Sequence, residues 1–196
     1  MSHFSVLVTG EDVAGQLQPY HEFESTGIDD EYVRNVDITK ELEKEYLEEA
    51  EGLASGRSFA EFAMYWHDLP VLPSGVEPKL NAEHKFGWVQ LAEPGYRVRV
   101  IKRTNPKAKW DWWEVGGRLS GLLLNKAGEW VEVCTKEDLD YPRMNREAIG
   151  VKFAVVSGGQ WYERGEGKMG EWHKEYWGLV DSLSDYTLLT VVDCHI

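Results

Sequence analysis

The sequence is poor in cysteine, in long apolar runs and in positive charge. Its 196 residues include only two cysteines, Cys134 and Cys194, too few for a disulfide framework or a four-ligand zinc site. We expect both to be reduced thiols. No apolar run approaches the ~20 residues that a membrane helix requires, and residues 1–4 do not have the pattern of a signal peptide. These absences argue against a membrane protein and a secreted disulfide scaffold, and we expect a cytoplasmic location.

Charge is unevenly distributed along the chain. Acidic residues number 34 against 21 Lys plus Arg, which gives a net charge of −13. Residues 1–60 hold 14 acidic and four basic side chains, whereas residues 97–126 hold eight basic and two acidic ones. Such a molecule repels duplex nucleic acid, yet a local basic patch can hold a small anion. The alternative is that the two regions neutralise each other across the fold.

Hydrophobic periodicity predicts an alternation of strands and helices. Residues 3–9 alternate with period two and indicate a strand. Apolar stripes predict helices over residues 40–53, from the capping-box pair Ser58 and Glu61 to about residue 68, and over residues 172–183. Three pairs of segments joined by turn residues predict β-hairpins: residues 86–91 with 96–103, 119–124 with 130–134, and 152–157 with 160–163. Residues 187–193 are almost wholly apolar, which indicates a central strand.

This order of elements predicts an α+β fold. We expect a mostly antiparallel sheet with the first and last strands central, a variant of the ferredoxin-like arrangement, with helices on one face and extra hairpins. No linker is long enough to separate two domains, so residues 1–196 are expected to form a single domain. If the first and last strands pair antiparallel, His3 lies near Asp193 and His195.

The segment 104–118 has the composition of a nucleotide site. Three tryptophans within four positions cannot all point into one core, so we expect Trp110 and Trp112 to be partly exposed and able to stack on a base. Further candidate ligand-binding residues are Asp111, Gly116 and Gly117, whose backbone can approach an oxyanion, and Lys107, Lys109 and Arg118, which can bind phosphate. The segment contains no established phosphate-binding loop motif. The alternative is a tryptophan-rich loop that packs over the end of the sheet.

His3, Asp193 and His195 form the candidate catalytic group. A carboxylate beside an imidazole can orient it as a general base. The tetrad His3-Phe4-Ser5-Val6 resembles the His-hydrophobic-Ser/Thr-hydrophobic element of the two-histidine phosphoesterases. The second element of that family is missing, since only Ile196 follows His195. The alternative is that these are polar residues at frayed strand ends. Three ligands without His-Cys spacing do not support zinc, so we expect no metal and no cofactor.

Three motifs together resemble a family of uncharacterised proteins of phages and their bacterial hosts. They are MSHFSVLV over residues 1–8, KWDW over 109–112 with GGR over 116–118, and VDCHI over 192–196. The resemblance spans nearly the whole chain. It implies a small accessory protein of an infected cell, of the kind that counters host defence, in some cases by sequestering or cleaving nucleotide signals.

Two functions are therefore expected, beside the alternative of a structural or assembly protein that binds no small ligand. The first is binding of a small phosphorylated nucleotide-type ligand, by sequestration or with phosphodiester cleavage in which His3 and His195 act as acid and base. The second is an acidic inhibitor or nucleic-acid mimic that binds a basic host protein, for which the acidic first 60 residues and the Glu-rich helix are the motivation.

Overall fold

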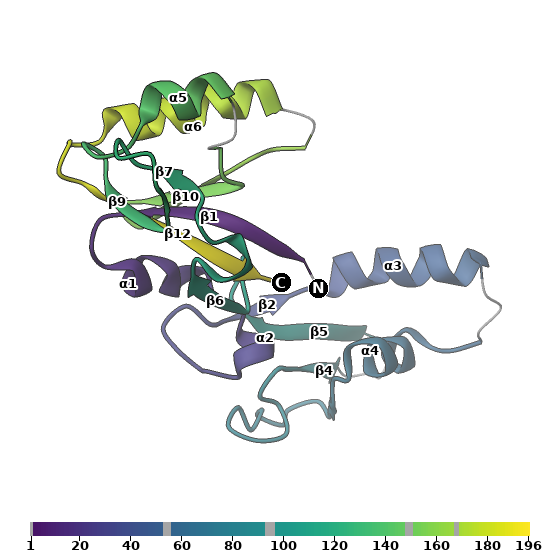
Figure 1. The fold of residues 1–196 in the computed structure, drawn as a ribbon. Helices are drawn as coiled ribbons and strands as arrows, with labels where there is room; N and C mark the ends of the chain where they lie inside the picture. The colour runs from purple at the N-terminus through teal and green to yellow at the C-terminus, as the bar shows by residue number, and fades with distance from the viewer. Residues whose placement is uncertain (1, 53–55, 93–96, 148–150, 167–168) are drawn as a thin grey trace. The chain divides into compact units, whose positions relative to one another are not determined.

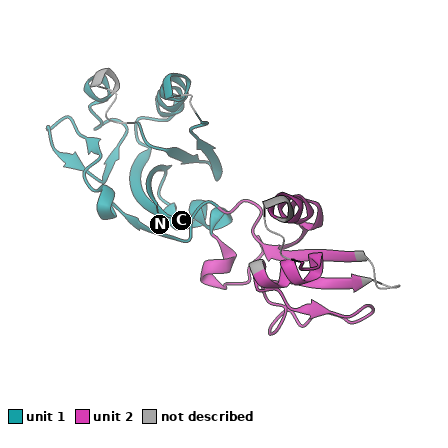
Figure 2. Cartoon of the chain, turned by 90° about the vertical axis from the view of Figure 1, so that its right-hand side faces the viewer, with its two compact units in different colours: residues 1–21, 109–196 teal, residues 22–108 magenta. Residues whose placement is uncertain are grey.

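The chain divides into two compact units. The computed structural model describes residues 2–52, 56–92, 97–147, 151–166 and 169–196 (Figure 1). One unit comprises residues 1–21 and 109–196, and the other comprises residues 22–108 (Figure 2). The predicted α+β class with mostly antiparallel strands is confirmed. The single folding domain expected from the sequence stays a prediction.

The sheet of the first unit has its two central strands from the two ends of the chain. Its order is β11-β10-β1-β12-β6, with β9 also paired to β12. The bounds are β1 His3–Thr9, β6 Trp112–Val115, β9 Val133–Thr135, β10 Ala154–Ser157, β11 Gln160–Glu163 and β12 Leu188–His195. β1 and β12 run antiparallel with His3 opposite His195, as predicted. β1 and β10 run parallel, and the other pairs of this sheet are antiparallel.

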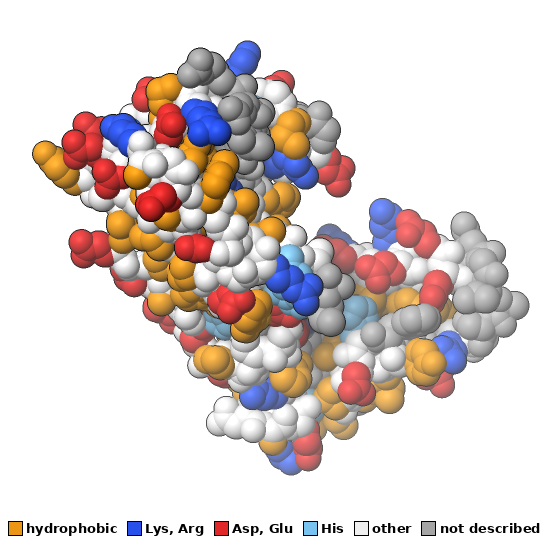
Figure 3. Space-filling view, viewed as in Figure 1, with side chains coloured by type: hydrophobic (Ala, Val, Ile, Leu, Met, Phe, Trp, Pro, Cys, Tyr) orange, Lys and Arg blue, Asp and Glu red, His pale blue; other side chains and the backbone are white. Residues whose placement is uncertain are grey.

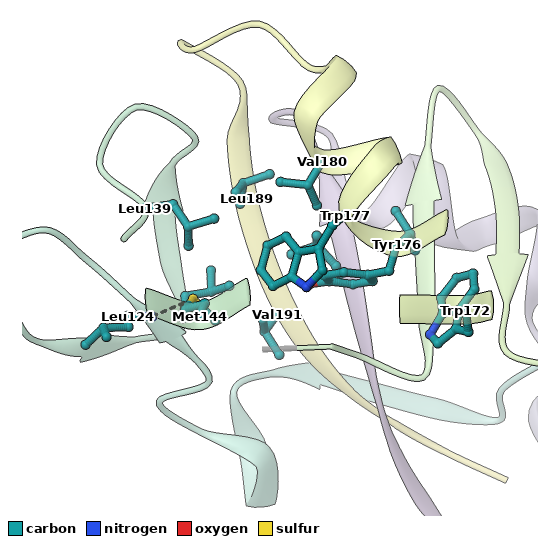
Figure 4. Close-up of a cluster of buried hydrophobic side chains, with 12 residues drawn as sticks. Leu124, Leu139, Met144, Trp172, Tyr176, Trp177, Val180, Leu189 and Val191 are labelled. Carbon is teal, nitrogen blue, oxygen red and sulfur yellow. Dashed lines mark hydrogen bonds between the residues drawn. The ribbon is translucent and has the colours of Figure 1, made fainter. Parts of the chain in front are cut away.

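One face of this sheet packs under two helices, α5 (Tyr141–Glu147) and α6 (Met169–Ser182). Figure 4 shows the cluster between them and the sheet, which includes Trp172, Tyr176, Trp177 and Val180 of α6 and Leu189 and Val191 of β12. The predicted apolar stripe therefore faces the sheet, since burial of large apolar side chains drives the docking of an amphipathic helix.

The opposite face is covered by shorter elements. Alternation along β1 sends Val6 and Val8 to this side, where they pack with Leu17 and Tyr20. These two residues belong to α1 (Val13–Leu17) and to the 3-10 turn η1 (Gln18–Tyr20). Helical elements thus lie on both faces of the sheet, whereas the sequence predicted helices on one.

The second unit has its own sheet and core. Its strands have the order β2-β5-β4-β3, with bounds β2 Arg34–Asp37, β3 Val71–Leu72, β4 Gly87–Ala92 and β5 Arg97–Thr104. The helices are α2 Phe23–Thr26, α3 Thr39–Gly52 and α4 Phe59–His67. Ser58 and Glu61 form the predicted capping box, and Leu42 and Phe62 pack on the sheet. β4 and β5 form the predicted hairpin, whose turn lies outside the described residues.

The remaining predicted hairpins are present in the first unit. β10 and β11 meet at Gly158 and Gly159, which have φ of +59° and +76°, values that glycine adopts without strain. β7 (Leu123–Leu124) and β8 (Trp130–Val131) form a shorter hairpin than expected, because β9 leaves it to join β12. In the described residues, no helix combines the length and apolar character needed to cross a bilayer.

Candidate functional site

Three strands of the first unit bring together side chains from distant parts of the sequence. His3 of β1 lies opposite His195 of β12, and His195 lies opposite Trp112 of β6. Residues directly opposite each other in an antiparallel ladder project to the same face. The row lies at one edge of a pocket of about 640 Å³ lined by His3, Trp112, Glu114, Arg118 and His195. The predicted pairing of the chain ends is thus confirmed, and it forms a pocket.

The first histidine is held by a buried carboxylate. His3 Nδ1 lies 2.9 Å from Asp193 Oδ1, and the Asp193 side chain is fully buried, whereas His3 is 20% exposed. Ser5, not His3, lies opposite Asp193, so the contact runs diagonally across the two strands. An ionised carboxylate only accepts hydrogen bonds. His3 therefore donates from Nδ1, and its Nε2 carries the lone pair when the ring is neutral.

The turn at Gly117 approaches this buried carboxylate closely. Arg118 N donates to Asp193 Oδ2 at 2.9 Å from the 3-10 turn η2 (Gly117–Leu119). Gly117 has φ of +53°, and a Cβ there would lie 2.7 Å from Asp193 Oδ2. Only glycine lets the turn approach so closely. The sequence predicted that the N–H groups of Gly116 and Gly117 would face a ligand oxyanion. Gly116 N donates instead to Val191 O, and the N–H that reaches an anion is that of Arg118, whose acceptor belongs to the protein itself.

The second histidine has a different carboxylate partner. His195 Nδ1 lies 2.7 Å from Asp111 Oδ1, and the two side chains are 14% and 22% exposed. Asp193 and His195 share a face of β12, as predicted, but Asp193 binds His3 instead. The two imidazole rings lie with centroids 5.1 Å apart at an interplanar angle of 69°. Neither Nε2 has a hydrogen-bond partner within the described residues.

This arrangement suits proton transfer. Each ring is fixed through Nδ1, so each leaves Nε2 to take or give a proton. A neutral and a protonated imidazole side by side can act as base and acid on one reacting group. No group of three or more potential metal ligands occurs in the described part of the chain.

The three clustered tryptophans differ in how far they are exposed. Trp112 is 47% exposed and lines the pocket. Trp110 is only 7% exposed, packs in the core on the α1 side, and donates from Nε1 to Leu17 O at 3.1 Å. Trp113 packs partly buried against the same cluster. Trp110 is therefore a core residue, and only Trp112 is available to stack on a ligand in the pocket.

Of the candidate phosphate-binding cations, the structure brings one to the pocket. Arg118 lines it, and its guanidinium has no carboxylate within 4.0 Å among the described residues. Lys109 pairs with Glu163 at 2.8 Å, and Lys107 is an exposed residue of the other unit. Neither lysine lines the pocket.

The other cations of the 97–126 window are largely neutralised within the second unit. Ion pairs join Arg99 to Asp37, Lys102 to Glu24 and Arg103 to Asp29. The alternative interpretation of the charge runs, mutual neutralisation, therefore holds for these three cations. An anion in the pocket would therefore be bound by the few side chains that line it, rather than by the summed charge of residues 97–126.

Sequence reasoning missed Glu114, which lines the pocket beside the histidines, and the role of Asp111 as the partner of His195. The signal for Glu114 was its place two residues after Trp112 on a strand, which puts both on one face. Nothing in the sequence indicated which strand β6 would join.

Comparison of the chain with protein-family models, with curated proteins and with solved structures found no match.

Proposed function

We propose that the pocket binds a small phosphorylated nucleotide and that His3 and His195 cleave its phosphodiester as a general acid–base pair. The observation that carries this proposal is the double His–Asp arrangement. Two imidazoles lie 5.1 Å apart between ring centroids, each bound through Nδ1 to its own carboxylate. A single His–Asp pair is compatible with a purely structural histidine. Two His–Asp pairs at the same pocket provide the base and the acid that a reaction with two proton transfers requires.

In the proposed step one bond to phosphorus forms, another breaks, and two protons move. One neutral imidazole takes the proton of an attacking hydroxyl, either water or a ribose hydroxyl, through Nε2. The hydroxyl oxygen forms a bond to phosphorus, and the bond from phosphorus to the leaving oxygen breaks. The other ring, protonated at the start, donates its proton to that leaving oxygen. The two rings end with exchanged protonation states, and this step needs no metal or redox partner.

Trp112 and Arg118 provide the binding contacts. The exposed indole can stack on a base, an interaction that tolerates any base because each has a π-face. The guanidinium can donate two parallel hydrogen bonds to phosphate oxygens. Both side chains line the same pocket as the two histidines, so a nucleotide stacked on Trp112 brings its phosphate within reach of them.

The binding of an anion in this pocket depends on the protonation of its two histidines. Glu114 lines the pocket, and Asp111 and Asp193 contact its histidines, so the carboxylates outnumber Arg118. An anionic phosphate therefore gains when one or both imidazoles are protonated.

The resemblance to phage proteins supplies the biological setting of this proposal. In that setting the protein is an accessory protein of an infected cell that acts in the host cytoplasm. By cleaving or sequestering a nucleotide signal it would weaken a host defence that depends on the signal.

The alternative function, an acidic mimic that binds a basic host protein, depends on the second unit. Glu45, Glu48 and Glu49 of α3 line a pocket of about 530 Å³ together with Phe62 and His67. This gives an acidic rim beside an apolar side chain, which suits a lysine or arginine of a partner. The acidic mimic stays a prediction, because fewer structural observations support it than support the histidine pocket.

The proposal is tested by incubating the protein with cyclic dinucleotides, the linear dinucleotide ApA and ADP-ribose derivatives. Products are separated by chromatography, and thermal unfolding is followed with and without each compound. His3→Ala and His195→Ala are each expected to lower the cleavage rate by about 10²–10⁴-fold. His173→Ala, which changes a histidine of α6 outside the pocket, is the matched control and should leave the rate unchanged.

The outcomes separate the two forms of the proposal. Stabilisation of the wild-type protein without product indicates sequestration, and equal activity of His195→Ala and wild type rules out the acid–base pair. A bound ligand at about 100 times its dissociation constant stabilises by about 2.7 kcal/mol. No shift and no product with any compound at such concentrations would remove the nucleotide pocket.

A further inference from the structure

A second pocket adjoins the first at His3. It has a volume of about 320 Å³, and its lining includes His3, Ser5, Lys152, Phe153, Arg164 and Trp172. His3 is the residue that both pockets share. A ligand that places a phosphate beside His3 therefore has space to continue on both sides of that ring.

The strand order puts the two pockets on opposite sides of His3. The first pocket uses β12 and β6, which lie on one side of β1. The second uses residues next to β10 and β11, on the other side of β1. Phe153 N donates to Ser5 O at 2.9 Å, and Arg164 N donates to Phe153 O at 3.1 Å, so backbone hydrogen bonds fix this side of the site.

The second pocket is cationic in a chain of net charge −13. Among the described residues that line it, Lys152 and Arg164 are basic and none is acidic. The Arg164 guanidinium lies 5.7 Å from the centre of the Phe153 ring, and Nη1 lies 3.9 Å from Met169 Sδ. No carboxylate in the described part of the chain pairs with it. An arginine held over an aromatic ring without an acidic partner is available to bind an anion.

Lys152 adds a buried amine to this pocket. Its side chain is almost fully buried, and Nζ donates to Leu122 O at 2.8 Å. Burial lowers the pKa of Lys152 to about 7, because the charged form loses its hydration. An anion that binds nearby favours the protonated amine, so an arriving phosphate and a proton stabilise each other there.

We propose that the second pocket holds an additional phosphate of the same ligand, so that the substrate is a phosphodiester-linked dinucleotide carrying a further phosphate rather than a mononucleotide. The inference rests on the proposed function. The scissile phosphate lies at His3 and His195, one nucleoside stacks on Trp112, and the other nucleoside directs its phosphate to Arg164 and Lys152. The second volume is at the lower end of the range for ligand pockets, which suits a phosphate with its sugar.

The experiment compares three probes: ApA, its 5′-phosphorylated form pApA and its 3′-phosphorylated form ApAp. Dissociation constants are measured by calorimetry in the His195→Ala background to limit cleavage, and kcat/KM is measured in the wild-type background. A terminal phosphate at one end is expected to strengthen binding about tenfold. Arg164→Gln is expected to remove this gain and to leave the affinity for ApA within about twofold.

Lys174→Gln is the matched control, because it removes an exposed cation of α6 outside the pocket and should keep the full gain. An unchanged melting temperature of Arg164→Gln shows that the variant is folded. The inference alone is wrong if the gain survives in Arg164→Gln, or if neither terminal phosphate strengthens binding. Binding of none of the probes contradicts the inference and the proposed function together.

Discussion

The two units carry nearly equal charge but arrange it differently. Residues 22–108 hold 17 acidic and 11 basic side chains, and the rest of the chain holds 17 and 10. In the second unit, arginines and lysines of β5 pair with carboxylates at 2.7–2.9 Å. In the first unit, Arg118 and Arg164 have no carboxylate partner among the described residues, while two carboxylates are bound to histidines. Figure 3 shows acidic and basic side chains interspersed on the visible face.

The comparison indicates that a candidate binding site is located by which charged side chains lack an ion-pair partner, rather than by the density of charge along the chain. The basic window at 97–126 crosses the boundary between the units, and much of it serves ion pairs. The pair of Arg99 and Asp37 is exposed and contributes little to stability, whereas the Arg103 guanidinium in the pair with Asp29 is buried. Buried or unpaired groups carry larger energies in either direction, so substitutions of such groups in the first unit should have larger effects than substitution of an exposed pair in the second.

The largest effect on stability is expected for Gly117→Ala in the first unit. The new Cβ would lie 2.7 Å from both Asp193 Oδ2 and Glu114 Oε1, and φ of +53° is strained for alanine. Because Asp193 is fully buried, it cannot move away without losing its bonds to His3 and Arg118. We expect the free energy of unfolding to fall by about 3 kcal/mol, measured by urea denaturation, together with loss of cleavage.

Gly128→Ala is the matched control for the backbone strain. Gly128 also has positive φ, +84°, but a Cβ there meets nothing within 4 Å. Its cost should be about 1 kcal/mol. Equal costs at the two glycines would mean that the close approach to Asp193 is not what requires glycine at position 117.

A smaller effect, of opposite sign, is expected for Lys152→Met. The pKa of Lys152 is about 7 in the folded chain and about 10.4 when unfolded. Between these values the unfolded chain binds more protons, so the stability of the wild type rises with pH from about 7 to about 10. Below pH 7 the full cost of the buried charge is present. The free energy of unfolding of the methionine variant should therefore exceed that of the wild type by about 2 kcal/mol at pH 6. At pH 9.5 the difference should be smaller.

Urea denaturation of both proteins at the two pH values measures this difference. Loss of the bond from Nζ to Leu122 O offsets part of the gain. A methionine variant that is less stable at pH 6, or a difference that does not change with pH, would show that the buried amine does not carry the predicted penalty.

The sequence predicts the framework of this site better than its details. The antiparallel pairing of the first and last strands followed from two apolar strand patterns at the chain ends, and it brings His3 to His195. Trp110 was misjudged because its burial depends on α1 and η1, short elements that no periodicity in the sequence indicates. The link from Asp111 to His195 was not predictable, because it requires β6 to be the neighbour of β12.

The smallest effect is expected for an exposed carboxylate of the second unit, Asp37. Its Oδ1 accepts from Thr39 Oγ1, and its Oδ2 accepts from Arg99 Nη2 at 2.7 Å. These bonds lower its pKa to about 2, below the unfolded value of about 3.9. The resulting stability is present above pH 4 and is lost as the pH falls toward 2. Because the side chain is 42% exposed, solvent screening limits its contribution to the free energy of unfolding to less than about 1 kcal/mol.

Asp37→Asn should therefore lower the free energy of unfolding by less than this amount at pH 7 and by nearly nothing at pH 2, measured by urea denaturation. A loss at pH 7 as large as that of Gly117→Ala would contradict the contrast between the units.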